Sequence, residues 1–274
     1  MTKSYFILFG NQPLASWVAS KLLERKDCSI LGVICSDLNR DYEHHGIDLP
    51  PLREYALNHD LNILNVSDIS HIVGSKKVMA LTIRWPNLLS KETLFCFKKG
   101  VLNFHGGFLP RWRGLNIPTH VILEGAKTSG ATIHFLDSKV DTGPILLRKS
   151  FSVDDLCTAF DIFLKTQVCL QELFVEALTK SMLDIKMAIP QKNFLEAGDK
   201  EATYTSTNPA GIRERSLDEG AESLLRAARA FEFPGYERAF IRIRENKFYL
   251  TPEFTSSSRI PKNLIDPFRK LTNS

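Results

Sequence analysis

The stretch SYFILFGNQPLASWVASKLLERKDCSILGVIC, residues 4–35, decides the fold class of the chain. It opens with an apolar run that ends at a Gly-Asn-Gln-Pro turn, and it closes with a run rich in Ile, Leu and Val. Between the two runs, apolar side chains recur at helical spacing, at Leu14, Trp17, Val18 and Leu22. Strand, turn, helix and strand in this order predict a βαβ unit, which pairs two parallel strands through a right-handed crossover.

The same alternation continues downstream and predicts an α/β fold, a Rossmann-like doubly wound and mostly parallel sheet with a small C-terminal α+β module. Further strands are expected over residues 61–64, 77–82, 100–104, 131–136 and 145–153. Further helices are expected over residues 51–58, 90–97, 118–124 and 154–182, with a Gly-, Pro- and Arg-rich loop over 106–116.

Three parts are predicted along the chain. They are an N-terminal domain over 1–185, a connector over 186–200 and a small C-terminal domain over 201–274 that ends in a polar tail. The C-terminal domain is expected to hold a helix over 217–230 and a hairpin that turns around Glu245 and Asn246.

Composition excludes several classes of protein. Hydrophobic residues make up 43% and charged residues 24% of the chain, as in globular domains, which excludes disordered, collagen-like and coiled-coil proteins. The net charge is only +4, and residues 201–274 hold twelve basic and ten acidic side chains. Because no basic segment stands out, neither a nucleic-acid nor a membrane partner is expected.

A cytoplasmic location is expected. No apolar run approaches the roughly 18 residues of a membrane span, and the N-terminus lacks the pattern of a signal peptide. The five cysteines are odd in number and form no CxxC pair, which favours free thiols in a reducing compartment. No metal site is expected either, since His44 and His45 are adjacent in a polar loop and no further ligands complete a pattern.

The strongest chemical signal lies at the end of the strand predicted over 100–104. Asn103 and His105 are two residues apart, so both side chains project from the same face of an extended chain. Open α/β sheets bind ligands at the carboxyl ends of such strands. An amide donor beside an imidazole suits chemistry at a carbonyl, whereas the alternative interpretation is a turn asparagine and a satisfied loop histidine.

Asp141 is the third candidate, within the turn DSKVDTGP that follows the strand predicted over 131–136. It lies at the ligand-binding edge if that strand is parallel, and its carboxylate could then orient the imidazole of His105. The alternative is a plain turn-forming aspartate.

These residues also carry a family resemblance. Residues 102–147, LNFHGGFLPRWRGLNIPTHVILEGAKTSGATIHFLDSKVDTGPILL, resemble the signature of the folate-dependent formyltransferases. The matching blocks are Asn-x-His, Leu-Pro-x-x-Arg-Gly, Gly-x-Thr-x-His and Asp-x-Gly-Pro, in the same order and at similar spacing. The resemblance extends over residues 4 to 180, approximately, and implies that Asn103, His105 and Asp141 are the catalytic trio.

The resemblance further implies that N10-formyltetrahydrofolate donates the formyl group. It implies two segments that contact the folate. Their residues are Arg84, Trp85, Leu88 and Leu89 in one segment and Leu136, Asp137, Ser138 and Val140 in the other.

Three acceptors are open within this family. A methionyl-tRNA formyltransferase implies a full C-terminal barrel and a basic surface for phosphates, but only 74 residues at net charge +2 follow position 200. A glycinamide ribonucleotide formyltransferase implies a Gly/Ser-rich phosphate loop, where this chain has Gly-Asn-Gln-Pro. A nucleotide-sugar N-formyltransferase is favoured, because TIRWPNLLSKETL and AARAFEFPGYERAFIRI resemble segments of that group.

The expected acceptor is therefore the primary amine of a dTDP-, UDP- or GDP-linked amino-dideoxy sugar for a surface polysaccharide such as lipopolysaccharide O-antigen. Candidate contacts with the nucleotide or its diphosphate are Asn11, Gln12, Arg111 and Arg113, with a solvated loop as the alternative for the two arginines. A non-catalytic folate- or nucleotide-binding module is the alternative from another class. A homodimer is expected, because the edge of the C-terminal hairpin could pair across two copies.

Overall fold

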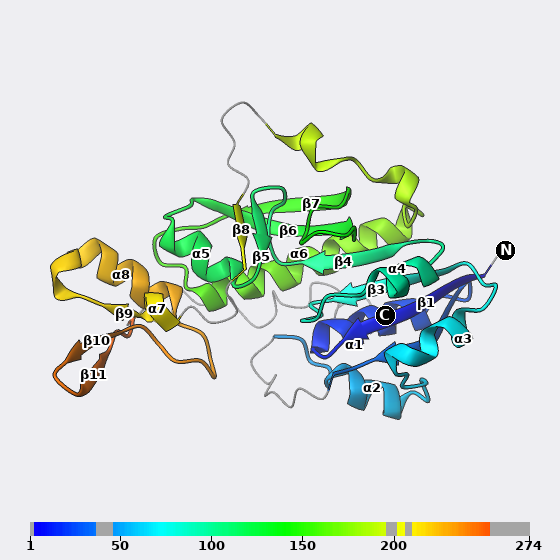
Figure 1. Ribbon diagram of the computed structural model, residues 1–274, viewed down its shortest axis with the longest axis horizontal. Helices are drawn as coiled ribbons and strands as arrows, with labels where there is room; N and C mark the ends of the chain where they lie inside the picture. Colours follow the sequence, from blue (N-terminus) through cyan, green and yellow to red (C-terminus); the bar gives the residue numbers. More distant parts are fainter. Residues whose placement is uncertain (1–2, 37–45, 196–201, 206–209, 253–274) are drawn as a thin grey trace, which may run out of the picture. The chain divides into compact units, whose positions relative to one another are not determined.

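The computed structural model describes residues 3–36, 46–195, 202–205 and 210–252 (Figure 1). The chain divides into two compact units. Unit 1 comprises the described parts of Met1–His105, Thr132–Arg148 and Leu170–Leu195, and unit 2 those of Gly106–Ala131, Lys149–Cys169 and Glu196–Ser274. The domain boundaries at 185 and 200 stay predictions, and the polar tail from residue 253 onward lies outside the described residues.

A six-stranded sheet in the order β2-β1-β3-β4-β6-β7 organises unit 1. Its strands are β1 (Ser4–Gly10), β2 (Cys28–Ile34), β3 (Val78–Ile83), β4 (Val101–His105), β6 (Thr128–Phe135) and β7 (Ile145–Ser152), of which β6 and β7 also contribute residues to unit 2. The first four run parallel, whereas β6 is antiparallel to β4. The prediction of a mostly parallel, Rossmann-like sheet is confirmed.

The helices of unit 1 cover this sheet. They are α1 (Pro13–Leu23), α2 (Leu52–Asn58), α3 (Ile69–Val73), α4 (Lys91–Cys96) and the second half of α6 (Ala159–Thr179), with short 3-10 turns η1 (Val66–Asp68), η2 (Ile185–Met187) and η3 (Gln191–Phe194). All six residues of β3 are buried, which is why its sequence VMALTI is almost continuously apolar. The ring of Phe174 packs against both Trp17 of α1 and Phe104 of β4, so α6 joins the strand core to the first helix.

Unit 2 has a core of its own. Helix α5 (Ile117–Leu123) packs against α8 (Ala221–Ala230), and buried residues between them include Val121, Ala227 and Phe231. The remaining elements are β5 (Trp112–Gly114), β8 (Ala202–Tyr204), α7 (Ala210–Arg213), β9 (Glu214–Arg215), η4 (Leu217–Glu219), β10 (Phe240–Ile243) and β11 (Asn246–Tyr249). β10 and β11 form the antiparallel hairpin expected around Glu245 and Asn246, beside β9, and the α+β module is confirmed.

Several predicted elements differ in the structure. The strand expected over 61–64 is a single bridge between Ile63 and Val33, and the segment over 66–73 forms η1 and α3 although only two of its residues are buried. The loop over 106–116 contains β5, which pairs with β8. The helix expected from 154 begins at Ala159, because the Asp154 carboxylate accepts hydrogen bonds from the backbone N–H groups of Leu156 and Cys157 and holds a turn there.

The cysteines are free thiols, as expected, but only Cys157 and Cys169 are fully buried. Burial raises the pKa of the Cys35 thiol to about 11. Cys35 therefore stays protonated near neutral pH and is a poor nucleophile. Among the described residues, none of the helices has both the length and the hydropathy that crossing a bilayer requires.

The interior strand β1 gives a direct test of this packing. Leu8 in β1 is 0% exposed, whereas Leu57 in α2 is 66% exposed. Leu8→Ala leaves a cavity in the sheet core and should cost about 2–5 kcal/mol of unfolding free energy, while Leu57→Ala should change it by less than about 0.5 kcal/mol. Urea denaturation followed by circular dichroism measures both, and equal midpoints for the two variants would contradict the placement of β1.

Candidate active site

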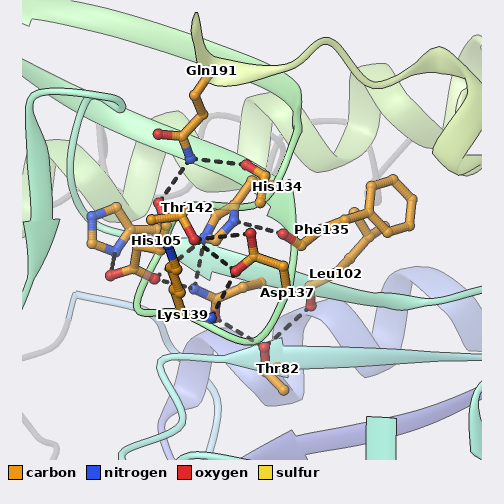
Figure 2. Close-up of polar contacts among 12 residues, drawn as sticks. Thr82, Leu102, His105, His134, Phe135, Asp137, Lys139, Thr142 and Gln191 are labelled. Atoms are coloured by element: carbon orange, nitrogen blue, oxygen red, sulfur yellow. Dashed lines mark hydrogen bonds and ion pairs between the residues drawn. The ribbon is translucent and has the colours of Figure 1, made fainter. Parts of the chain in front are cut away.

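Four polar side chains gather where β4 and β6 pair. In the antiparallel register Asn103 lies opposite His134, and His105 lies opposite Thr132. Asn103 Nδ2 donates to Asp141 Oδ1 at 3.3 Å, and His105 Nδ1 lies 3.5 Å from Asp141 Oδ2. Figure 2 shows His105, His134 and Thr82 in this cluster. The three residues singled out in the sequence are therefore in mutual contact through the carboxylate of Asp141.

The orientation of the Asn103 amide is fixed by its neighbours. The Thr82 hydroxyl donates to Asn103 Oδ1 at 2.9 Å, and Asn103 Nδ2 lies 3.1 Å from His134 Nε2. His134 Nδ1 lies 2.9 Å from the carbonyl oxygen of Phe135, so Nδ1 carries the proton of the neutral ring and Nε2 accepts from Asn103. Both amide protons of Asn103 are thus directed at acceptors, one on His134 and one on Asp141.

The position of Asp141 beside His105 has a different structural cause from the one that the sequence suggested. It was expected at the ligand-binding edge on the condition that its strand is parallel, but β6 is antiparallel. The carboxyl end of β6 at Phe135 therefore lies beside Leu102, at the amino end of β4, rather than beside His105. Asp141 contacts His105 only because the turn over residues 136–144 folds back along the sheet.

The fold of this turn is set by short-range hydrogen bonds. Phe135 N–H donates to the Pro144 carbonyl at 2.9 Å and closes the base of the turn. The Asp137 carboxylate accepts from Lys139 N at 3.0 Å and from Thr142 Oγ1 at 2.7 Å. Gly143 is required because a Cβ there would lie 1.9 Å from the carbonyl oxygen of Phe135. Asp141 itself has φ of 50°, in the left-handed region.

Burial strengthens the electrostatics of this cluster. The side chain of His105 is 7% exposed and that of Asp141 12% exposed. A carboxylate with so little water contact interacts strongly with the amide of Asn103 and with the two imidazoles of His105 and His134. Such a set can hold an imidazole in one orientation, stabilise its protonated form and donate to a developing oxyanion.

The first predicted folate segment follows β3. Arg84 has φ of 50°. This backbone conformation is uncommon for a residue other than glycine, and residues that adopt it cluster at functional sites. The indole of Trp85 packs edge-on against Phe9, and its Nε1 is buried without a hydrogen-bond partner in the described part of the chain. Leu89 packs on the apolar core, whereas Leu88 is 84% exposed. An unpaired donor and an exposed apolar side chain fit a planar polar ring system.

The second predicted folate segment is the start of the turn that carries Asp141. Leu136 packs on the core of unit 1, while Ser138 and Val140 are exposed. The carboxylate of Asp137 accepts hydrogen bonds within the turn, so it acts on the shape of the turn. The backbone groups next to Asp137 are therefore the ones that a ligand would contact in this segment.

The four predicted substrate contacts lie in different surroundings. The Asn11 amide exchanges two hydrogen bonds with Ser36, at 2.7 and 2.8 Å, and so ties the ends of β1 and β2 together. Gln12 directly precedes α1, and its Oε1 is buried without a partner among the described residues. Arg111 and Arg113 belong to unit 2.

Arg111 and Arg113 differ in exposure. Arg111 stacks over Trp112 at 4.7 Å and lies 3.7 Å from the Glu124 carboxylate, whereas Arg113 is buried within β5. Among the residues that the structure describes, no three His, Cys, Asp or Glu side chains are arranged to hold a metal ion. His44 and His45 lie outside the described residues.

Two residues of the site were not singled out in the sequence. Thr82 orients Asn103, and its signal is that it is the one polar residue in the apolar strand VMALTI. Gln191 donates to backbone carbonyls of the Asp141 turn from a polar segment that has no recognisable pattern.

Comparisons with known proteins find similarity to formyltransferases over the part of the chain that holds this site. The model of the formyl transferase domain matches residues 66–178, which include Asn103, His105 and Asp141. The chain is 26% identical over 252 residues to the methionyl-tRNA formyltransferase of Wolbachia pipientis, covering 88% of this chain and 78% of that enzyme. Seven further curated relatives carry the same name, and this chain spans 50% to 64% of their length.

Solved structures with the same fold include several N-formyltransferases. A 4-N formyltransferase from Francisella tularensis superposes with a TM-score of 0.72 at 16% identity, over 92% of this chain and 98% of that one. An N-formyltransferase from Helicobacter canadensis, in complex with folinic acid and dTDP-3-aminofucose, gives 0.69 at 19% identity, over 90% and 86%. Methionyl-tRNA formyltransferase from Clostridium thermocellum gives 0.60 at 18% identity, over 94% and 95%.

The identities to these structures are too low to carry more than the fold. The family model, in contrast, spans the strand, the turn and the three side chains that meet at the end of β4. Residues 66–178, which hold all three side chains, match the formyl transferase family model, and the chain shares its fold with formyltransferases of known structure.

Proposed function

We propose that this chain transfers the formyl group of N10-formyltetrahydrofolate to the primary amine of a nucleotide-linked amino-dideoxy sugar. The observation that carries the proposal is the contact of Asn103 and His105 with the carboxylate of Asp141. The product would serve a surface polysaccharide such as lipopolysaccharide O-antigen, made in the cytoplasm. No metal ion is needed for this chemistry.

The three side chains divide the work of the transfer. As the neutral amine attacks the formyl carbon, negative charge develops on the formyl oxygen, and Asn103 and His105 donate to it. Asp141 accepts from His105 Nδ1, so Nε2 carries the proton transfer: as the bond between the formyl carbon and the folate nitrogen breaks, Nε2 gives its proton to that nitrogen and regains the proton that the attacking amine loses. Because Asn103 Nδ2 directs its protons to His134 and Asp141, the longer contact, 3.3 Å to Asp141, is the one exchanged for the oxyanion.

Two observations support a sugar nucleotide as acceptor. The structural likeness is higher for a sugar 3N-formyl transferase, at a TM-score of 0.71, and for the enzyme in complex with dTDP-3-aminofucose, at 0.69, than for the methionyl-tRNA enzyme at 0.60. In addition, the described part of the C-terminal module pairs five of its basic side chains with carboxylates. The pairs are Arg215–Glu219, Arg226–Glu222, Arg238–Glu232, Arg242–Glu214 and Lys247–Glu237. A surface that binds tRNA would instead offer such cations to phosphates.

The alternative acceptor is a charged initiator tRNA, which the names of the sequence relatives favour. Glycinamide ribonucleotide is a third acceptor within the family. A non-catalytic module that only binds folate or nucleotide is the alternative from another class, and the assembled trio argues against it.

A panel of acceptors tests the proposed substrate. The purified chain is incubated with N10-formyltetrahydrofolate and, separately, dTDP-, UDP- and GDP-linked amino sugars, glycinamide ribonucleotide and charged initiator tRNA, and formylated product is measured by mass spectrometry. We expect turnover with an amino sugar. Formylation of the tRNA or of the ribonucleotide without sugar turnover would identify the alternative acceptor, and binding without any turnover would support the non-catalytic module.

The catalytic roles are tested by single substitutions. Asn103→Ala and His105→Ala should each lower kcat by about 10²–10³, because each removes a donor to the developing oxyanion. His71→Ala, at an exposed histidine of α3, is the matched control and should keep full activity. Steady-state rates with folded variants decide the point, and near-normal formyl transfer by His105→Ala would refute its assignment.

We propose that the chain acts as a homodimer through the hairpin of β10 and β11. β11 is an edge strand of its sheet, and Ile243, Phe248 and Tyr249 are all about half exposed on the hairpin. An apolar edge strand of this kind is prone to pair with a second copy.

Sedimentation velocity tests this assembly. The unaltered chain should sediment as a dimer, and Phe248→Lys should shift it towards the monomer because a charge is placed on the pairing surface. Leu57→Lys, at an exposed position of α2, should leave the dimer intact. A monomer mass for the unaltered chain at every concentration would exclude the dimer.

A further inference from the structure

We propose that Gln191 is a positioning residue of the active site, which holds the Asp141 turn in the geometry that catalysis uses. The inference rests on the proposed function for its catalytic consequence. The polar segment that follows α6, interpreted from the sequence as the start of a connector, thereby contributes to the active site.

Gln191 binds the turn at two points. Its Nε2 donates to the carbonyl oxygen of Asp141 at 2.7 Å and to that of Gly143 at 2.8 Å (Figure 2). The residue is only 5% exposed. A primary amide has two protons on one nitrogen and can serve both carbonyls at once, and these lie on either side of Thr142. The backbone of the turn is therefore clamped directly at Asp141.

The segment around Gln191 is anchored to the strand that leaves the turn. Ile189 and Ile145 exchange two backbone hydrogen bonds of 2.8 Å each, in an antiparallel bridge. On the other side of Gln191, Arg148 of β7 stacks on the ring of Phe194 at 4.1 Å. Gln191 thus lies between two contacts with β7, and these contacts fix the position from which its side chain reaches the turn.

The clamp acts on a strained position. Asp141 has a left-handed backbone, with φ of 50°, and it is not a glycine. Such a conformation persists where the surroundings over-determine it. If the amide of Gln191 is removed, two poorly hydrated carbonyls lose their donor and the turn is released. The Asp141 carboxylate is then no longer held at 3.3 Å from Asn103 and 3.5 Å from His105.

Two substitutions at this position separate hydrogen bonding from packing. Gln191→Leu keeps the volume but removes the donor, and we expect kcat to fall by about 10- to 100-fold, the scale of a small misplacement of a catalytic group. The KM for the folate should rise as well, because the released turn also carries the predicted folate contacts Ser138 and Val140, whereas the KM for the acceptor should change little. Asn193→Ala, at an exposed position of the same turn η3, is the matched control and should retain the unaltered kcat.

Gln191→Glu adds a signature in pH. Its carboxylate would point an oxygen at two carbonyl oxygens, whereas its protonated form would donate one hydrogen bond. The activity of Gln191→Glu relative to Gln191→Leu should therefore rise as the pH is lowered, which a role in packing alone would not produce. Equal kcat for Gln191→Leu and the unaltered chain, or a ratio independent of pH, would overturn the proposal.

Hydrogen exchange tests the clamp without any turnover. In Gln191→Leu, amides of residues 136–144 should exchange at least about 10-fold faster, since the turn opens more often, while Asn193→Ala should leave them unchanged. If the unaltered chain proves inactive towards every acceptor, the proposed function is wrong and exchange alone decides whether Gln191 holds the turn. Unchanged exchange in Gln191→Leu would refute the clamp.

Discussion

The candidate site depends on one constraint, the reversal of direction between β4 and β6. Because β6 is antiparallel, its carboxyl end lies beside Leu102, and the chain must fold back over residues 136–144 before a carboxylate can meet His105. The hydrogen bonds of Asp137, the close approach of Gly143 to Phe135 and the amide of Gln191 all serve that fold-back. The contact of Asp141 with Asn103 and His105 is the result of it.

The second feature of the site is that each polar atom of the Asn103 amide has a partner. Thr82 accounts for the oxygen of the Asn103 amide, and His134 and Asp141 account for its protons. Buried polar networks that are satisfied in this way specify a single arrangement, and they are costly when one member is lost. A substrate oxyanion can enter such a network only by replacing a contact, and the 3.3 Å contact between Asn103 and Asp141 is the longest that Asn103 makes in it.

Much of this could be predicted from local pattern. The βαβ unit over residues 4–35 and the period-two placement of Asn103 and His105 follow from spacing, and spacing is what a sequence records most clearly. The direction of β6 could not be predicted, because an apolar strand has the same pattern in either direction. The role of Gln191 is equally invisible, since it acts on Asp141 across fifty residues of chain and lies in a polar segment. Thr82 left a weak signal, a single hydroxyl in an otherwise apolar strand.

The central claim is that Asn103 and Asp141 act as one unit, and a double-mutant cycle measures this most directly. Formyl-transfer rates are compared for the unaltered chain, Asn103→Ala, Asp141→Ala and the double variant, each checked for a folded state. If the two side chains act together, their effects on kcat are not additive. The double variant should then lose about as much kcat as the worse of the two single variants. Losses that multiply would show two independent contributions and would contradict the account.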